Sequence, residues 1–151
     1  MASQDSELIK LYSKRILALA AEIPHLGLLE DAHARVTKRS PLCGSTVTVD
    51  LCVHEGRITA FGQEVKACAL GQASAAIFGA QALGRTRAEV EAVRLALRNM
   101  LRFGAEPPAA PFEDYAVLAP AKEYKNRHAS ILLVLDATVA AFDTLAAGTP
   151  P

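Results

Sequence analysis

Alternating apolar and polar residues predict a β-hairpin in the middle of the chain. From Thr46 to His54, valine and leucine side chains occupy every second position, as in a strand with one buried face. Glu55-Gly56 supplies a two-residue turn, and a second strand-forming run continues to residue 66. If residues 55 and 56 form the loop, cross-strand partners have numbers that add to 111. A bulge near residues 61–63 would shift this register by one residue.

The segments before the hairpin indicate one amphipathic helix and one short strand. Apolar residues recur at nearly helical spacing over residues 6–23, with Ser6 as a candidate N-cap and Pro24 as the terminator. A short strand is expected over Arg35–Arg39. It would complete a small antiparallel sheet with the hairpin.

The segments after the hairpin predict three helices. Residues 73–83 are mostly small, with Gly84 as a natural C-cap. Thr86 and Glu89 have the spacing of a capping box that starts the next helix. The last helix is expected to begin near Asn126. The inward stripes of the last two helices are Val90, Val93, Leu97 and Met100 or Leu101, and Ile131, Leu132, Leu135, Val139 and Phe142.

The order of helix, strands and then helices favours an α+β fold. We expect an antiparallel sheet of about three strands packed against several α-helices. The 151 residues are typical of a single domain, here spanning 1–151 with a frayed tail at 148–151.

Composition narrows the function classes. The formal net charge is zero, so the chain lacks the basic footprint expected for binding nucleic acid or an anionic membrane. We see no leader peptide and no apolar stretch expected to span a bilayer, and therefore predict a cytoplasmic protein. An odd number of cysteines, three in all, argues against a disulfide framework.

The hairpin register brings two of the cysteines together. Cys43 and Cys68 have numbers that add to 111, so they would lie opposite each other, with Cβ atoms roughly 5 Å apart. His128 falls in the first turn of the last helix, on its inward face. Two thiolates and an imidazole suit zinc or an iron-sulfur cluster. The alternative is that buried cysteines pack as small apolar residues and that the histidine is a hydrogen-bonded core residue.

A series of arginines runs along the helix that the Thr86–Glu89 capping box starts. It leaves two interpretations open: a solvated helix face, or a docking surface for an acidic partner. The series comprises Arg85, Arg87, Arg94, Arg98 and Arg102.

Three short motifs resemble those of NifU-type iron-sulfur scaffolds, the group that contains IscU and SufU. Pro41–Gly44 resembles the family's Pro-x-Cys-Gly-Asp signature. Ala67–Leu70, followed by Gln72–Ala75, is similar to its Gly-Cys-Ala-Ile segment and Ala-Ser-rich helix. His128–Leu132 resembles the His-Cys-Ser-Ile-Leu segment of IscU-like members. The three motifs occur in the family's order, and the resemblance covers roughly residues 20 to 145.

The resemblance implies a scaffold or carrier rather than an enzyme. Such a protein receives sulfur from a cysteine desulfurase and assembles a labile [2Fe-2S] cluster for transfer to iron-sulfur acceptor proteins. Cys43, Cys68 and His128 match family ligands for the cluster or metal. A chaperone is a further expected partner, because Leu118–Lys122 faintly resembles the family's Leu-Pro-Pro-Val-Lys motif.

Two departures from the family pattern keep other functions open. Ser45 stands where the family has an aspartate, and Ala129 stands where a third cysteine would follow the histidine. One alternative is a zinc-binding, SufU-like sulfur acceptor with sulfurtransferase-like activity. The other is a degenerate paralogue that keeps the fold and a regulatory or binding role but builds no cluster.

Overall fold

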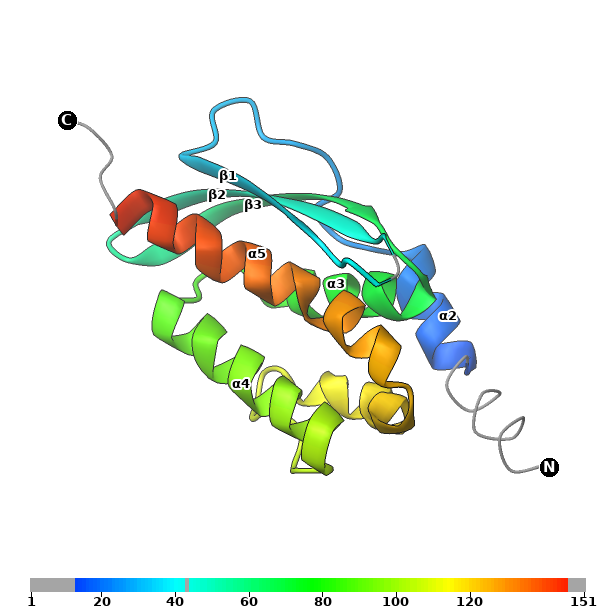
Figure 1. Ribbon diagram of the computed structural model, residues 1–151. Helices are drawn as coiled ribbons and strands as arrows, with labels where there is room; N and C mark the ends of the chain where they lie inside the picture. The colour runs from blue at the N-terminus through cyan, green and yellow to red at the C-terminus, as the bar shows by residue number, and fades with distance from the viewer. Residues whose placement is uncertain (1–12, 43, 147–151) are drawn as a thin grey trace, which may run out of the picture.

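A three-stranded antiparallel sheet forms one layer of the molecule, and helices cover one of its faces (Figure 1). The computed structural model describes residues 13–42 and 44–146. The strands are β1 (Ala34–Arg39), β2 (Thr46–His54) and β3 (Arg57–Lys66), with β2 in the centre. The predicted α+β fold class is confirmed.

The helices form two further layers below the sheet. Helix α5 lies across β1 and β2, and α3 packs beside it, next to β3. Helix α4 packs on α5 on the side away from the sheet. The helical elements are α2 (Lys14–Ala21), α3 (Ala69–Ala80), α4 (Arg87–Phe103), the 3-10 helices η1 (Glu113–Glu123) and η2 (Lys125–Arg127), and α5 (His128–Ala146).

The hairpin turn is confirmed, but the register away from it is not the predicted one. Glu55 and Gly56 both have positive φ, 53° and 78°, as a tight two-residue hairpin turn requires. Beyond the two pairs nearest the turn, the ladder shifts by one residue, so that Cys52 pairs with Ala60. The bulged residue is Thr59, whose hydroxyl donates to the carbonyl of Cys52 at 3.2 Å. The bulge therefore lies closer to the turn than residues 61–63.

Helix α3 begins earlier than its sequence pattern suggested. It starts at Ala69 rather than residue 73, directly after Cys68 as N-cap, and ends at Ala80. The Gly84 C-cap prediction is wrong, because Gln81 occupies that position and Gly84 donates instead to the carbonyl of Ile58. Only Ala67 and Cys68 separate the end of β3 at Lys66 from the start of the helix.

The other helix boundaries agree in part. Helix α5 begins at His128, and Asn126 lies in the preceding 3-10 turn rather than acting as its N-cap. Of the helix predicted over residues 6–23, Lys14–Ala21 is helical with Ser13 as N-cap, while Ser6 lies outside the described residues. The capping box is confirmed, since Thr86 and Glu89 hydrogen-bond each other's backbone N–H groups.

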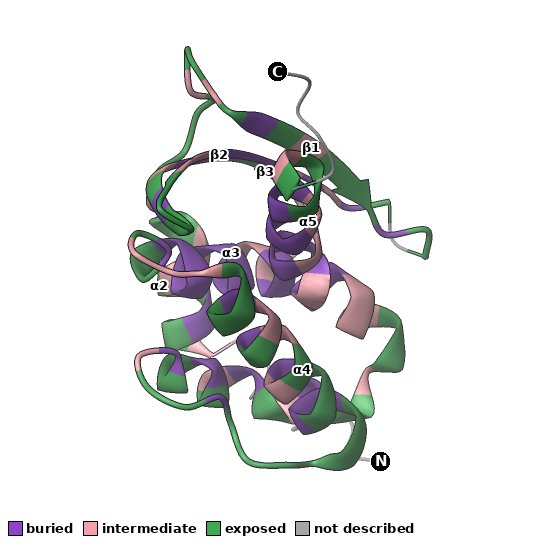
Figure 2. Cartoon of the chain, turned by 90° about the vertical axis from the view of Figure 1, so that its left-hand side faces the viewer, coloured by how far each residue is buried: buried purple, intermediate pink, exposed green. Residues whose placement is uncertain are grey.

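The core joins all three layers. Figure 2 shows buried residues concentrated where α3, α4 and α5 face one another and the sheet. An aromatic series crosses these layers: Phe61 of β3 meets Phe78 of α3 edge to face at 5.6 Å, and Phe78 stacks on Phe112 at 5.7 Å between ring centroids. The predicted stripes of α4 and α5 face this core, with Leu132 half-buried.

Helix α5 owes its apolar sequence to its central position. The segment Lys125–Ala146 is long and apolar enough by composition to cross a membrane, contrary to our expectation that no such stretch exists. However, 56% of its most apolar window is buried within the protein. A helix packed on both a sheet and another helix needs apolar residues around most of its circumference.

The outer face of the sheet carries a buried carboxylate. Asp50 of β2 is fully buried and accepts a hydrogen bond from the backbone N–H of Leu29 at 2.8 Å. The Arg35 guanidinium, half-exposed on β1, donates to both carboxylate oxygens at 2.7 and 2.8 Å. Burial raises the pKa of Asp50, but these hydrogen bonds outweigh burial and hold the pKa below its ordinary value.

Removing the guanidinium tests this arrangement. We expect Arg35→Ala to lower the free energy of unfolding at pH 7, because the buried Asp50 carboxylate loses its cationic partner. The loss should be smaller than for a fully buried pair, since Arg35 is half-exposed. The lowered pKa means that Asp50 stabilises the wild type above the ordinary carboxyl pKa, and this stability is lost as the pH falls through the folded-state pKa. The difference between variant and wild type should therefore shrink in acid.

Urea unfolding at neutral and acidic pH measures both effects. Arg39→Ala, an exposed residue of the same strand, is the matched control and should leave stability nearly unchanged. A cost for Arg35→Ala that is the same at both pH values would contradict the ion-pair argument.

Candidate functional site

Cys68 lies where the sheet layer passes into the helical layer. It follows β3 and is the N-cap residue of α3, with extended backbone at φ −66° and ψ 169°. Its side chain is half-buried. The Sγ atom lies 3.5 Å from the hydroxyl of Ser130 in the first turn of α5. The thiol is therefore held between the starts of two helices.

The surroundings of Cys68 favour its thiolate. Burial raises the pKa of the thiol, but a larger combined effect lowers it below its ordinary value. That effect comes from hydrogen bonds of the Ser130 hydroxyl, the backbone N–H groups of Gly71 and Leu70, and the Arg127 side chain. The thiolate is both the nucleophilic form and the metal-binding form of cysteine, so Cys68 has the character that sulfur acceptance or metal binding requires.

Ser130 also connects Cys68 to the segment before β2. Its hydroxyl oxygen lies 3.1 Å from the Ser45 hydroxyl oxygen, and both serines are buried. A Cβ atom on Gly71 would lie 2.6 Å from the Ser130 hydroxyl oxygen, so only glycine permits this approach of α3 to α5. The fold thus joins the segments that carry all three motifs.

Cys43 lies outside the described residues, so its predicted approach to Cys68 stays a prediction. The hairpin register from which it was made is shifted by one residue in the structure. Around it, the connection from β1 to β2 is closed by two backbone hydrogen bonds, from Ser40 to the Ser45 carbonyl at 2.8 Å and from Gly44 to the Ser40 carbonyl at 2.9 Å. Gly44 has a φ of 71°, which glycine adopts without steric cost.

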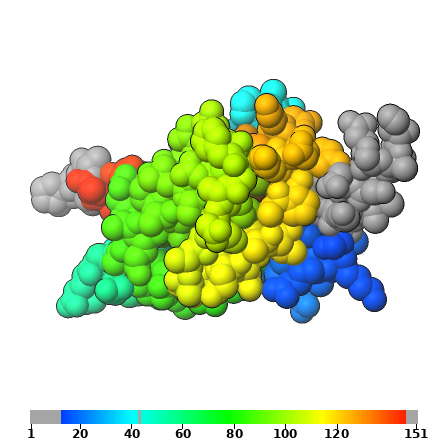
Figure 3. Space-filling model, turned by 90° about the horizontal axis from the view of Figure 1, so that it is seen from below, coloured from blue at the N-terminus to red at the C-terminus, as the bar shows by residue number. Residues whose placement is uncertain are grey.

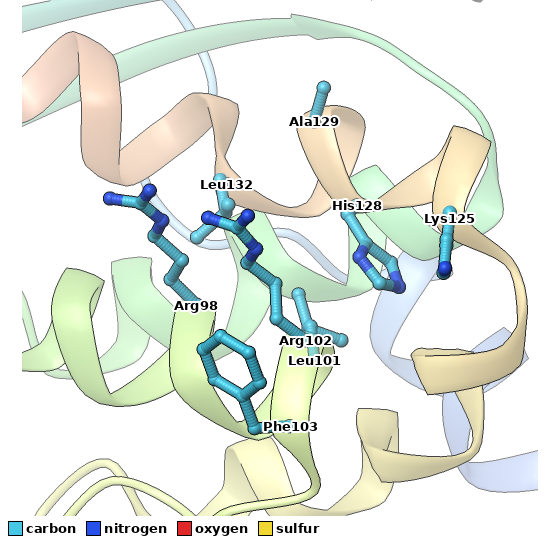
Figure 4. A pocket seen from close by; sticks show the side chains of 8 residues that line it. All are labelled: Arg98, Leu101, Arg102, Phe103, Lys125, His128, Ala129 and Leu132. Carbon is cyan, nitrogen blue, oxygen red and sulfur yellow. The ribbon is translucent and has the colours of Figure 1, made fainter.

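His128 faces a different side of α5 from Ser130. Its Nε2 lies 2.9 Å from the carbonyl oxygen of Ala121, and its ring borders a groove between α4 and α5 (Figure 4). Because a carbonyl only accepts, Nε2 is the donor, which leaves the Nδ1 lone pair of a neutral ring for a ligand. Residues two apart on a helix point to different sides, so the structure does not bring His128 to Cys68.

No group of three His, Cys, Asp or Glu side chains that could hold a metal occurs within residues 13–42 and 44–146. Of the predicted ligands, Cys68 and His128 are described but separate. Sequence reasoning missed Ser130 and Arg127, which bear on the Cys68 thiolate. The sequence feature that could have identified them is their position next to His128 and Ala129 in the third motif.

The chain is similar to proteins of known structure. Searches of protein-family models and of curated proteins found no match. The chain is similar to a nitrogen-fixing NifU-like protein (N-terminal) from Brucella abortus, with 39% identity and a TM-score of 0.91, covering 95% of this chain and 99% of that one.

Two other structures share the fold. One is assigned as an iron-sulfur cluster assembly scaffold protein for the SUF system, from the thermophile Fervidobacterium islandicum AW-1. The identity is 25%, the TM-score is 0.76, and the alignment covers 87% of this chain and 96% of that one. The other is a hypothetical protein at 21% identity and a TM-score of 0.76, covering 85% of this chain and 94% of that one.

Removing one hydroxyl tests the environment of Cys68. We expect Ser130→Ala to raise the pKa of the Cys68 thiol, because the variant loses a hydrogen bond to the thiolate. The alkylation rate of Cys68 by iodoacetamide, followed by mass spectrometry across pH, should then reach its midpoint at higher pH than in the wild type.

Thr144→Ala is the control, since it removes an exposed hydroxyl from the same helix. An unchanged Cys68 profile in a folded Ser130→Ala protein would show that the hydroxyl does not stabilise the thiolate.

Proposed function

This chain belongs to the family of NifU-like N-terminal domains, and from that premise we propose that it is an iron-sulfur cluster assembly scaffold. The observation that carries the proposal is the thiolate-favouring site at Cys68, built where the three family motifs meet. The similarity to a protein assigned as a SUF-system scaffold supports the same role. The chain then acts as a carrier of iron and sulfur rather than as an enzyme.

Sulfur enters, in this proposal, through Cys68. Its thiolate attacks the outer sulfur of a persulfide on a cysteine desulfurase. A new S–S bond forms at Cys68 while the persulfide's S–S bond breaks, and the desulfurase cysteine leaves as a thiolate. The Ser130 hydroxyl and the N–H groups at the start of α3 orient the attacking sulfur. Half-burial limits the access of other oxidants and thiols to it.

The cluster is cargo, and we propose Cys43, Cys68 and His128 as its ligands. In this proposal the His128 ring leaves the Ala121 carbonyl and turns towards Cys68 when the cluster binds. Thiolate and imidazole are ligands that iron-sulfur chemistry uses. Ser45 contributes no carboxylate at this site, and its hydroxyl is engaged with Ser130. Three protein ligands leave one position of a [2Fe-2S] cluster to solvent, a thiol or a partner. Such a cluster would be labile, as transfer to an acceptor protein requires.

A second candidate is a family member that builds no cluster. The specific observation in its favour is that Ser45 and Ala129, at two family ligand positions, offer no ligand of comparable strength. A zinc-bound sulfur acceptor is the third reading, because two thiolates and an imidazole also suit zinc with one open position. The metal content of the protein as purified separates these functions.

Anaerobic reconstitution with iron and sulfide tests the scaffold proposal. We expect sulfide-to-iron charge-transfer bands in the visible spectrum of the wild type. These bands should be lost in Cys43→Ser and Cys68→Ser and weakened in His128→Ala.

Cys52→Ser is the matched control, because Cys52 lies on β2 with its sulfur 3.4 Å from the Asp31 carbonyl, outside the proposed site; its bands should persist. A wild type without bands but with stoichiometric zinc would favour the sulfur acceptor, and one with neither would favour the paralogue that builds no cluster.

A further inference from the structure

The arginine series that begins at Arg85 and continues along α4 divides into two halves with different surroundings. The first half is neutralised by carboxylates: Arg85 pairs with Glu89, Arg87 with Asp143, and Arg94 with Glu91 and Asp136. Arg98 and Arg102, in the second half, form no ion pair with any described residue. The solvated-face interpretation therefore does not describe the whole series.

The unpaired arginines border a groove between α4 and the start of α5. Arg98 and Arg102 are one helical turn apart, so their side chains share a face, and Figure 4 shows both guanidinium groups directed towards α5. Lys125 and His128 lie on the other side. The groove encloses about 520 Å³, and none of the described residues that line it is acidic.

The groove combines positive charge with an apolar surface. Leu101 and Leu132 line it, and Phe103, 70% exposed, stands at its edge with the Arg102 guanidinium 5.6 Å from the ring centroid. Figure 3 shows the surface on which α4, ending in yellow-green, adjoins the start of α5, in orange. Because the whole chain has zero net charge, this uncompensated cluster is a local feature rather than a consequence of a basic protein.

We propose that this groove is the docking site for an acidic segment of a partner protein. An arginine guanidinium binds a carboxylate through two parallel hydrogen bonds, and an arginine cluster is a known means of recognising acidic motifs. The apolar lining favours a segment that also carries leucine-like side chains, which a small inorganic anion lacks. The site lies on the opposite side of the α5 start from Ser130, so a docked segment leaves Cys68 accessible. This inference does not depend on the proposed function.

A synthetic peptide of alternating glutamate and leucine is the probe. Its binding to the metal-free protein is measured by fluorescence anisotropy. We expect Arg98→Glu/Arg102→Glu to weaken binding by tenfold or more, about the loss of one strong charged contact. Binding to the wild type should also weaken as salt rises from about 0.05 to about 0.3 M.

Lys14→Glu/Arg39→Glu is the matched control, because it makes the same change of net charge at exposed positions that do not line the groove. It should bind within about twofold of the wild type, and circular dichroism should show both double variants folded. Equal weakening in both variants would overturn the proposal, since only general charge attraction would remain. Displacement of the peptide by equimolar pyrophosphate would overturn it in favour of a small-anion site. Reconstitution of the cluster is scored separately and does not enter this test.

Discussion

The close contact between α3 and α5 is the constraint on which the rest of the structure depends. A side chain at Gly71 would collide with Ser130, so the two helices meet at the distance that glycine allows. This approach brings the start of α5 within reach of the Cys68 sulfur. The contact between α3 and α5 continues further into the core, where the buried Ser74 hydroxyl donates to the Ile131 carbonyl at 2.6 Å. The spacing of the two helices, the hydrogen bonds between them and the environment of the Cys68 thiol all depend on the contact between Gly71 and Ser130.

A buried tyrosine connects the α3–α5 contact to the outer helical layer. The hydroxyl of Tyr115, in η1, donates to the Ser74 carbonyl at 2.9 Å and lies 3.0 Å from its hydroxyl. Burial raises the pKa of Tyr115 far above its ordinary value, so the group stays a neutral donor at any physiological pH. Satisfied polar groups of this kind fix one arrangement of a core more sharply than apolar contacts do. The positions of α3 and α5 are therefore specified as well as stabilised.

Local patterns predicted local structure well. The Glu55-Gly56 turn and the Thr86–Glu89 capping box depend on a few adjacent residues, and both were found. The start of α3 was misplaced because Cys68 and its neighbours carry no strong capping signal, and the 3-10 helix η1 was missed for the same reason. The direction of the His128 ring could not be predicted, because it depends on Ala121, whose position is set by packing. The motifs identified the family, but the contacts of Ser130 required the fold.

The extra residue at Thr59 changes which residues of β3 face the core on either side of it. Ile58 and Phe61 are both buried although they are three positions apart, which a strand of strict period two does not allow. The bulge reconciles them and moves the partner of Lys66 from Ser45 to Thr46. Ser45 thereby lies just beyond the last rung of the ladder, where its side chain is engaged by α5. One bulged residue close to the turn thus sets the alignment of the far end of the hairpin. The position of Ser45 relative to Ser130 and Cys68 therefore depends on a residue at the opposite end of the sheet.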